Sequence, residues 1–169
     1  MARQFSLPEE IPGIEILPPA ADASGRSGAW VFTGYWDKIY VVCRVNQGNA
    51  ATVQFTPQQA KDLSGTGAKA LTNNCSIWTN LNTSSGDQYT KQASAANYTT
   101  DAGTHSKFVV FEIVPQDHMD VTDGFCTLTC NTGASNAANI TQIDVYGLTR
   151  FKQANPPSVL TLPGSTGAL

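Results

Sequence analysis

The segment Lys38-Ile39-Tyr40-Val41-Val42-Cys43-Arg44-Val45 carries the clearest secondary-structure signal in the chain. β-Branched and aromatic side chains fit the pleated surface of a sheet, so this run predicts a β-strand. Residues 107–114 have a similar composition and stop before Pro115, which predicts a second long strand. Apolar residues are nearly continuous at 39–43 and 108–111, a pattern typical of central strands that are covered on both faces. The opposite sheet would cover one face, and residues 1–27 are a candidate for the cover of the other.

Shorter strands are predicted on either side of these two, between turn signals. They span residues 29–33, 51–55, 68–71, 76–79, 88–92, 97–100, 125–130 and 140–151. Thr56 at an N-cap position, followed by Pro57, predicts a short helix over residues 56–63, and residues 117–121 predict a helical turn. Many short strands with one or two short helices predict an all-β antiparallel sandwich.

A weak internal repeat refines the expected topology. Residues 46–53 are similar to residues 131–140 in their Asn, Gly and Ala content, and each stretch joins two predicted strands. Because Asn and Gly tolerate positive φ, both stretches are predicted to be hairpin tips. Two such hairpins suit the halves of a jelly-roll-like, or double Greek-key, sandwich. Chance recurrence in a chain rich in these residues is the alternative interpretation.

Residues 1–27 differ from the rest and predict an extended N-terminal arm. Prolines at 8, 12, 18 and 19 exclude a continuous helix. The apolar residues between them must be buried either on the arm's own domain or on a neighbouring subunit: Phe5, Leu7, Ile11, Ile14, Ile16 and Leu17. A sandwich domain is predicted over residues 28–154, and an extended tail over residues 155–169. Deletion of residues 2–22 is therefore expected to leave a folded domain that no longer binds its partner.

Composition narrows the functional class. The chain has 169 residues, 14% of them charged, and a formal net charge of −3. That balance argues against nucleic acid as a partner, because phosphate binding needs a basic face. No apolar stretch is long enough to span a membrane, and the first residues do not resemble a secretory signal, so folding in a cytoplasm is expected.

Residues that carry chemistry are sparse. Cys43, Cys75, Cys126 and Cys130 form no C-x-x-C pair, which predicts reduced, mostly buried thiols and no metal site. No nucleophile elbow, phosphate-binding loop or H-E-x-x-H motif is present. An enzyme on this scaffold would have to bring together at least two side chains of a small set: Glu112, Asp117, His105 and His118. We therefore predict no enzymatic activity and no cofactor.

Aromatic residues leave a second class open. Together, Trp30, Tyr35, Trp36 and Trp78 would make a platform for sugars if they shared one surface, although such residues are more often core or interface anchors. The alternative function is accordingly a carbohydrate- or receptor-binding β-sandwich module.

Several stretches resemble a family of head decoration, or cement, proteins of tailed bacteriophages, which are small structural proteins encoded beside the major capsid protein. The stretches are Gln4-Phe5-Ser6-Leu7-Pro8-Glu9-Glu10-Ile11-Pro12, Val45-Asn46-Gln47-Gly48-Asn49-Ala50-Ala51 and residues 16–22, 55–60, 65–71 and 132–140. The resemblance implies a jelly-roll-like sandwich that stabilises the capsid shell at subunit junctions. It supplies no catalytic residues, and residues 72–107 and 115–126 match it least. In the same phage setting, the alternative carbohydrate- or receptor-binding module would belong to a tail or fibre.

The predicted partners are the major capsid protein and further copies of this chain, as a dimer or trimer, in a virion assembled in the host cytoplasm. The arm supplies the predicted interface residues Phe5, Leu7, Ile11, Ile14, Ile16 and Leu17. Trp30, Tyr35 and Trp36 are predicted as further interface anchors.

Overall fold

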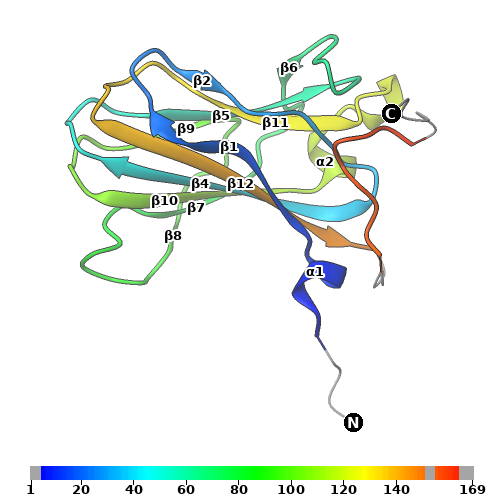
Figure 1. The fold of residues 1–169 in the computed structure, drawn as a ribbon, viewed down its shortest axis with the longest axis horizontal. Helices are drawn as coiled ribbons and strands as arrows, with labels where there is room; N and C mark the ends of the chain where they lie inside the picture. Colours follow the sequence, from blue (N-terminus) through cyan, green and yellow to red (C-terminus); the bar gives the residue numbers. More distant parts are fainter. Residues whose placement is uncertain (1–4, 151–154, 164–169) are drawn as a thin grey trace.

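The structure, a computed structural model, describes residues 5–150 and 155–163. Two antiparallel sheets face each other (Figure 1). Sheet A has the strand order β1 (Gly13–Ala21), β12 (Asn139–Thr149), β4 (Trp36–Gln47), β10 (Ser106–Ile113), β7 (Ser76–Asn80) and β8 (Thr90–Lys91). Sheet B has the order β2 (Arg26–Ser27), β11 (Thr127–Thr132), β5 (Gln54–Ala60) and β6 (Lys69–Ala70), with β3 (Val31–Phe32) paired to β11 and β9 (Tyr98–Thr99) paired to β5. The helical elements are α1 (Leu7–Glu10), α2 (Pro115–His118) and the 3₁₀ turn η1 (Val121–Asp123).

The predicted all-β sandwich is confirmed, and its connectivity is that of a jelly roll. The chain crosses between the sheets from β4 to β5, from β10 to β11 and from β11 to β12. Within sheet A, β4 lies between β12 and β10, while in sheet B β5 lies beside β11. Strands that alternate between two sheets in this order form two interlocked Greek keys.

The core follows the two-residue period of the strands. Along β4, Val41 and Cys43 point inward and are fully buried, whereas Val42 between them is half-buried on the outside. Along β10, Val109 and Phe111 point inward and Val110 points outward in the same way. The expectation that both strands are covered on two faces is therefore wrong. The arm that was predicted to supply a cover instead adds a strand to the edge of sheet A.

That added strand corrects the predicted arm. Residues 13–21 form β1, which pairs with β12 from Gly13 opposite Tyr146 to Ala21 opposite Ile140. Ile16 and Leu17 are only 3% exposed and belong to the protein's own core. Deletion of residues 2–22 would remove an edge strand and uncover this core, so it does not separate binding from folding.

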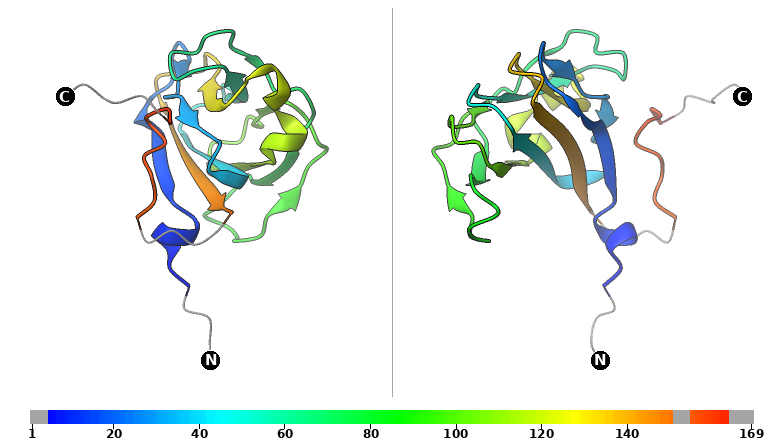
Figure 2. Two further views of the ribbon diagram at one scale, coloured as in Figure 1. Left: turned by 90° about the vertical axis from the view of Figure 1, so that its right-hand side faces the viewer. Right: turned by 60° about the vertical axis from the view of Figure 1, so that its left-hand side comes forward.

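The C-terminal segment also packs on the sandwich in its described part. The amide of Phe32 donates a hydrogen bond to the Val159 carbonyl at 2.8 Å, and the Val159 side chain packs against the core. Pro156 and Pro157 line a pocket together with Gly13 and Ile14 at the start of β1. The described C-terminal segment runs on the β1 side of the sandwich (Figure 2). The predicted extended tail is thus held at the sheet edge over residues 155–163, and its remaining residues lie outside the described ones.

The predicted helix at residues 56–63 is wrong, because residues 54–60 form β5. Phe55, Pro57 and Gln59 alternate into the sandwich and are buried, and Pro57 pairs with Cys130 of β11. Burial of these side chains and pairing with β11 outweigh the local helix-start signal of Thr56 and Pro57.

The two similar Asn- and Gly-rich stretches are connections between sheets rather than hairpin tips. They pack against each other at one end of the sandwich, where the fully buried Asn139 links them. Its amide nitrogen Nδ2 donates to the Ala51 carbonyl at 2.8 Å, and its Oδ1 accepts from the Asn49 amide at 2.8 Å. Gly48 has a negative φ, and the glycine is required because a Cβ there would lie 2.6 Å from the Ala138 carbonyl oxygen.

All four cysteines are free, as predicted, and Cys43, Cys75 and Cys130 are buried. Burial raises the pKa of the Cys75 thiol to about 11, so the thiolate is disfavoured at neutral pH. No helix in the described part of the chain is long and apolar enough to cross a membrane.

Candidate functional site

The N-terminal end of the described chain exposes large apolar side chains. Phe5 is 58% exposed and Leu7 is 52% exposed. Pro8 sits in the first turn of α1, where its fixed φ suits a helix, and Pro12 follows one turn later. The element is therefore a single helical turn, which projects from the sandwich beyond the edge of sheet A (Figures 1 and 2).

The base of this segment is fixed to the sheet although its tip is exposed. The Thr149 hydroxyl donates to the Glu10 carbonyl at 3.2 Å, and the Gly147 amide donates to the Pro12 carbonyl at 3.0 Å. Gly13 lies under the ring of Tyr146, where a Cβ would approach the ring carbons to 2.5 Å. These contacts hold residues 9–13 at one position on β12, so the direction of the exposed tip is defined.

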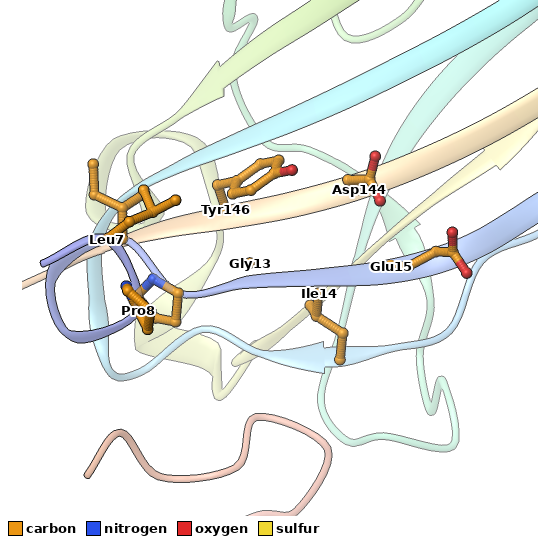
Figure 3. A pocket seen from close by; sticks show the side chains of 9 residues that line it. Leu7, Pro8, Gly13, Ile14, Glu15, Asp144 and Tyr146 are labelled. Atoms are coloured by element: carbon orange, nitrogen blue, oxygen red, sulfur yellow. The ribbon is translucent and has the colours of Figure 1, made fainter.

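An open hollow of about 360 Å³ lies between this segment and β12. Leu7 and Pro8 stand at one end of it and Glu15 and Asp144 at the other, with Tyr146 between them (Figure 3). Gln142 Nε2 donates to Glu15 Oε2 at 3.1 Å, and Arg44 pairs with Asp144 at 3.5 Å. The hollow thus combines apolar walls with carboxylates at one end, a chemistry that suits an apolar chain segment carrying a basic group.

The predicted interface residues divide into surface and core. Phe5 and Leu7 are exposed, and Ile11 is half-buried beside the hollow. Ile14 is half-buried and packs against the core. Ile16, Leu17 and Trp36 are buried in the protein's own core and are not surface residues of this fold, because β1 and β4 pair with β12 and turn these side chains between the sheets. Trp30 and Tyr35 are half-buried, and their role as interface anchors stays a prediction.

The aromatic platform predicted for sugars does not assemble. Trp36 is only 2% exposed, and Gly147 leaves room for its ring, since a Cβ there would lie 1.9 Å from Trp36 Cδ2. Trp30 packs beside Gly65, which follows β5 of sheet B, whereas Trp78 lies on β7 of sheet A. The four residues therefore do not share one surface.

Of the residues that an enzyme would have brought together, His105 lies at the opposite end of β10 from Glu112, Asp117 and His118. His105 precedes β10 and His118 follows it, so this eight-residue strand lies between them. Glu112 pairs with Lys38 at 2.9 Å, and the Nδ1 atom of His118 accepts a hydrogen bond from the Val114 amide at 2.9 Å. Within residues 5–150 and 155–163, no group of three or more His, Cys, Asp or Glu side chains is arranged to hold a metal ion.

A surface that the sequence analysis missed covers the outside of sheet A. We call it the aromatic face and define it by its half-buried apolar and aromatic residues, which are Tyr40, Val42, Trp78, Phe108, Val110 and Tyr146. Exposed apolar residues extend it at both ends of β12, namely Ile140 and Leu148. The near-continuous apolar runs at 39–43 and 108–111 indicate this surface in the sequence. The sequence analysis instead predicts from them strands that another segment of the same chain covers.

Comparisons with known proteins leave the chain without an assigned family. No family model matches it, and no curated protein matches its sequence. A solved structure, that of the SPBc2 prophage-derived protein YomS, is similar with a TM-score of 0.46 and 9% sequence identity. The similarity covers 81% of this chain and 92% of YomS. No residue role is transferred from that protein.

Proposed function

We propose that the protein is a capsid decoration, or cement, protein of a tailed bacteriophage. It binds the major capsid protein in the assembled shell and stabilises the junctions between subunits. Two considerations support this proposal: the resemblance of residues 4–12 and of the other stretches given above to decoration proteins, and the exposed apolar tip at residues 5–7. The protein acts by binding, and the proposal assigns it no catalytic step.

The exposed tip is the observation that carries the proposal. Large exposed apolar side chains gain nothing from contact with water. Because Phe5 and Leu7 are each a little over half exposed, their burial on a partner would contribute about 2–3 kcal/mol before ordering costs. Because residues 9–13 are already fixed to β12, only a short stretch must be ordered on binding. A tip of this kind suits repeated attachment to a large assembly.

Attachment at many equivalent positions would give the shell its additional stability. Each bound copy buries surface across a junction, and opening that junction then requires the buried contacts to be broken. Internal pressure from packaged DNA acts to open these junctions, so a decorated shell resists it better than a bare one. In this proposal the mature protein is located in the virion.

Co-sedimentation tests the proposal. Capsids assembled from the proposed partner, the phage's major capsid protein, are mixed with the purified protein and pelleted. The wild-type protein is expected to pellet with the capsids to saturation, while the double variant Phe5→Ser/Leu7→Ser is expected to lose at least about 10-fold in affinity, from the burial of two apolar side chains.

A matched control uses Val121→Ser, since Val121 is an exposed apolar residue of η1, away from the tip. This variant is expected to bind like the wild type. Both proteins should retain the wild-type unfolding midpoint, because neither substitution touches the core. Wild-type protein that fails to bind capsids, or a double variant that binds as well as Val121→Ser, contradicts the proposal.

A further inference from the structure

The aromatic face has no second layer over it. In the described part of the chain, only the β7–β8 connection and the α1 segment extend beyond this side of sheet A (Figures 1 and 2). These two projections stand at opposite edges of the sheet, because α1 precedes β1 and the connection leads to β8. The surface between them is left open for a flat partner.

One row of this face has its charges ordered across the strands, while Lys38, Arg44 and Glu112 elsewhere on the face are held in ion pairs. The strand register aligns six outward residues in one row, from β1 to β8: Glu15, Asp144, Val42, Val110, Trp78 and Lys91. Carboxylates stand at the β1 edge, apolar side chains occupy the centre, and an ammonium group stands at the β8 edge. Asp144 is already paired with Arg44, while Glu15 and Lys91 are exposed and have no ion-pair partner among the described residues.

This order is complementary to itself. When two copies stack face to face about a two-fold axis parallel to the strands, the row reverses, and Glu15 of each copy lies over Lys91 of the other. At the centre of the row, Val42 of each copy then lies over Val110 of the other. Trp78 of each copy lies over Asp144 of the other, which Arg44 already pairs. A two-fold axis across the strands would instead place carboxylate on carboxylate, which is unfavourable.

The size of the face is sufficient for such a pair. Six strands spaced about 4.8 Å apart, with about four outward positions along each long strand, present about 600 Å² per copy. The pair would bury about 1,200 Å², at the lower end of specific interfaces. The two projections do not meet, because α1 lies at the end of the strands where Gly13 pairs with Tyr146, whereas the β7–β8 connection follows Asn80 at the opposite end, where Asn80 pairs with Phe108.

We infer that the aromatic face pairs with the same face of a second copy about a two-fold axis parallel to the strands, with Glu15 opposite Lys91. The inference does not depend on the proposed binding to capsids, since it concerns the purified protein alone. It assigns the tip at residues 5–7 and the aromatic face to two different contacts.

Sedimentation velocity over a range of concentrations tests the pairing. The wild-type protein is expected to show a monomer–dimer equilibrium on the order of micromolar. Val110→Glu places an uncompensated charge at the apolar centre and is expected to weaken dimerisation by about 100-fold or more. Gln54→Glu, on the outside of sheet B, introduces the same charge on an exposed strand position and is expected to leave dimerisation unchanged.

Charge exchange tests the direction of the axis. Glu15→Lys and Lys91→Glu each turn two attractive pairs of the dimer into repulsive ones, so each variant alone is expected to dimerise about 10-fold more weakly. A mixture of the two variants restores both pairs, and it is expected to associate more tightly than either variant alone. The doubly exchanged protein, Glu15→Lys/Lys91→Glu, is expected to dimerise like the wild type.

Three results would overturn the inference. They are a wild-type protein that stays monomeric at every concentration, a Val110→Glu variant that dimerises normally with an unchanged unfolding midpoint, and a mixture that associates no better than its components. A monomer that loses capsid binding on Val110→Glu would assign the aromatic face to the capsid protein instead of a second copy.

Discussion

The outer faces of the two sheets are built from different chemistry although both belong to the same sandwich. Sheet B presents amides and hydroxyls to the outside, with Asn131 Nδ2 donating to Gln58 Oε1 at 2.9 Å and Thr56 beside them. Sheet A presents the aromatic face, where Lys38, Arg44 and Lys91 lie over Tyr40, Phe108 and Trp78. One face satisfies its polar groups with itself and with water, whereas the other holds apolar surface that a partner can cover.

The start of β10 reverses the usual placement of charged and aromatic side chains. Its charged residue points between the sheets, and its aromatic residue points outward. Lys107 is fully buried between the sheets, while its neighbour Phe108 lies on the aromatic face. The Lys107 ammonium group donates to Asp101 Oδ1, to the Asp101 carbonyl and to Gln47 Oε1. All three of its donors are thus satisfied, which makes its burial tolerable.

The largest expected effect on stability comes from removing one partner of the Lys107–Asp101 ion pair. Asp101→Ala leaves a buried ammonium group without its carboxylate and is expected to lower the free energy of unfolding by about 2–4 kcal/mol. Lys107→Met removes the charge itself and is expected to change stability by less than about 1 kcal/mol. Gln47 Oε1 keeps the Thr100 hydroxyl as a donor in that variant. Urea unfolding followed by circular dichroism measures both, and equal losses would contradict the assignment.

A smaller expected effect on stability distinguishes the inward from the outward side chains of β4. Val41→Ala removes a fully buried side chain and is expected to cost about 2–3 kcal/mol, through lost transfer free energy and a cavity. Val42→Ala lies on the aromatic face and is expected to cost less than about 1 kcal/mol in dilute monomer. Gln58→Ala on sheet B serves as the polar control. Similar losses for Val41→Ala and Val42→Ala would show that the aromatic face is already covered in the monomer.

The smallest expected effect is a dependence of stability on pH. The hydrogen bond from Lys107 is the main cause that lowers the pKa of Asp101 below its ordinary value. The folded state therefore holds this carboxylate deprotonated, and its contribution is present above the unfolded pKa of about 3.9 and is lost as pH falls through the lower folded pKa. Unfolding midpoints measured between neutral and acidic pH are expected to fall less steeply for Asp101→Asn than for the wild type. An unchanged slope would contradict this role of Asp101.

Much of the fold was predictable because it follows from local periodicity. The runs at 38–45 and 107–114 are rich in β-branched and aromatic residues, which favour strands, and the structure places β4 and β10 there. The absence of a short-spaced cysteine pair also predicted reduced, mostly buried thiols, and the structure has four free cysteines, three of them buried. Alternation along each strand then decides which residues share a side.

The candidate site was predictable only in part. The exposed tip with Phe5 and Leu7 was identified from the apolar residues between the prolines, but Ile16 and Leu17 were assigned to a partner although they are core residues. The same apolar pattern is compatible with an arm that binds a neighbouring subunit and with an edge strand that joins the chain's own sheet. In both cases, one side of an extended segment is buried. Pairing with β12 distinguishes the two, and β12 lies more than a hundred residues away in the sequence.

The amino-acid sequence by itself determined that this chain forms strands, that their apolar residues alternate or run together, and that little charge remains for the surface. Tertiary structure alone decided that residues 13–21 join sheet A, that residues 54–60 form a strand and not a helix, and that the outside of β4 and β10 stays uncovered. The physical reason is that periodicity depends only on residues that are neighbours in the sequence. Which segment covers a strand depends instead on contacts between distant parts of the chain, and the local pattern does not determine the free energies of those contacts.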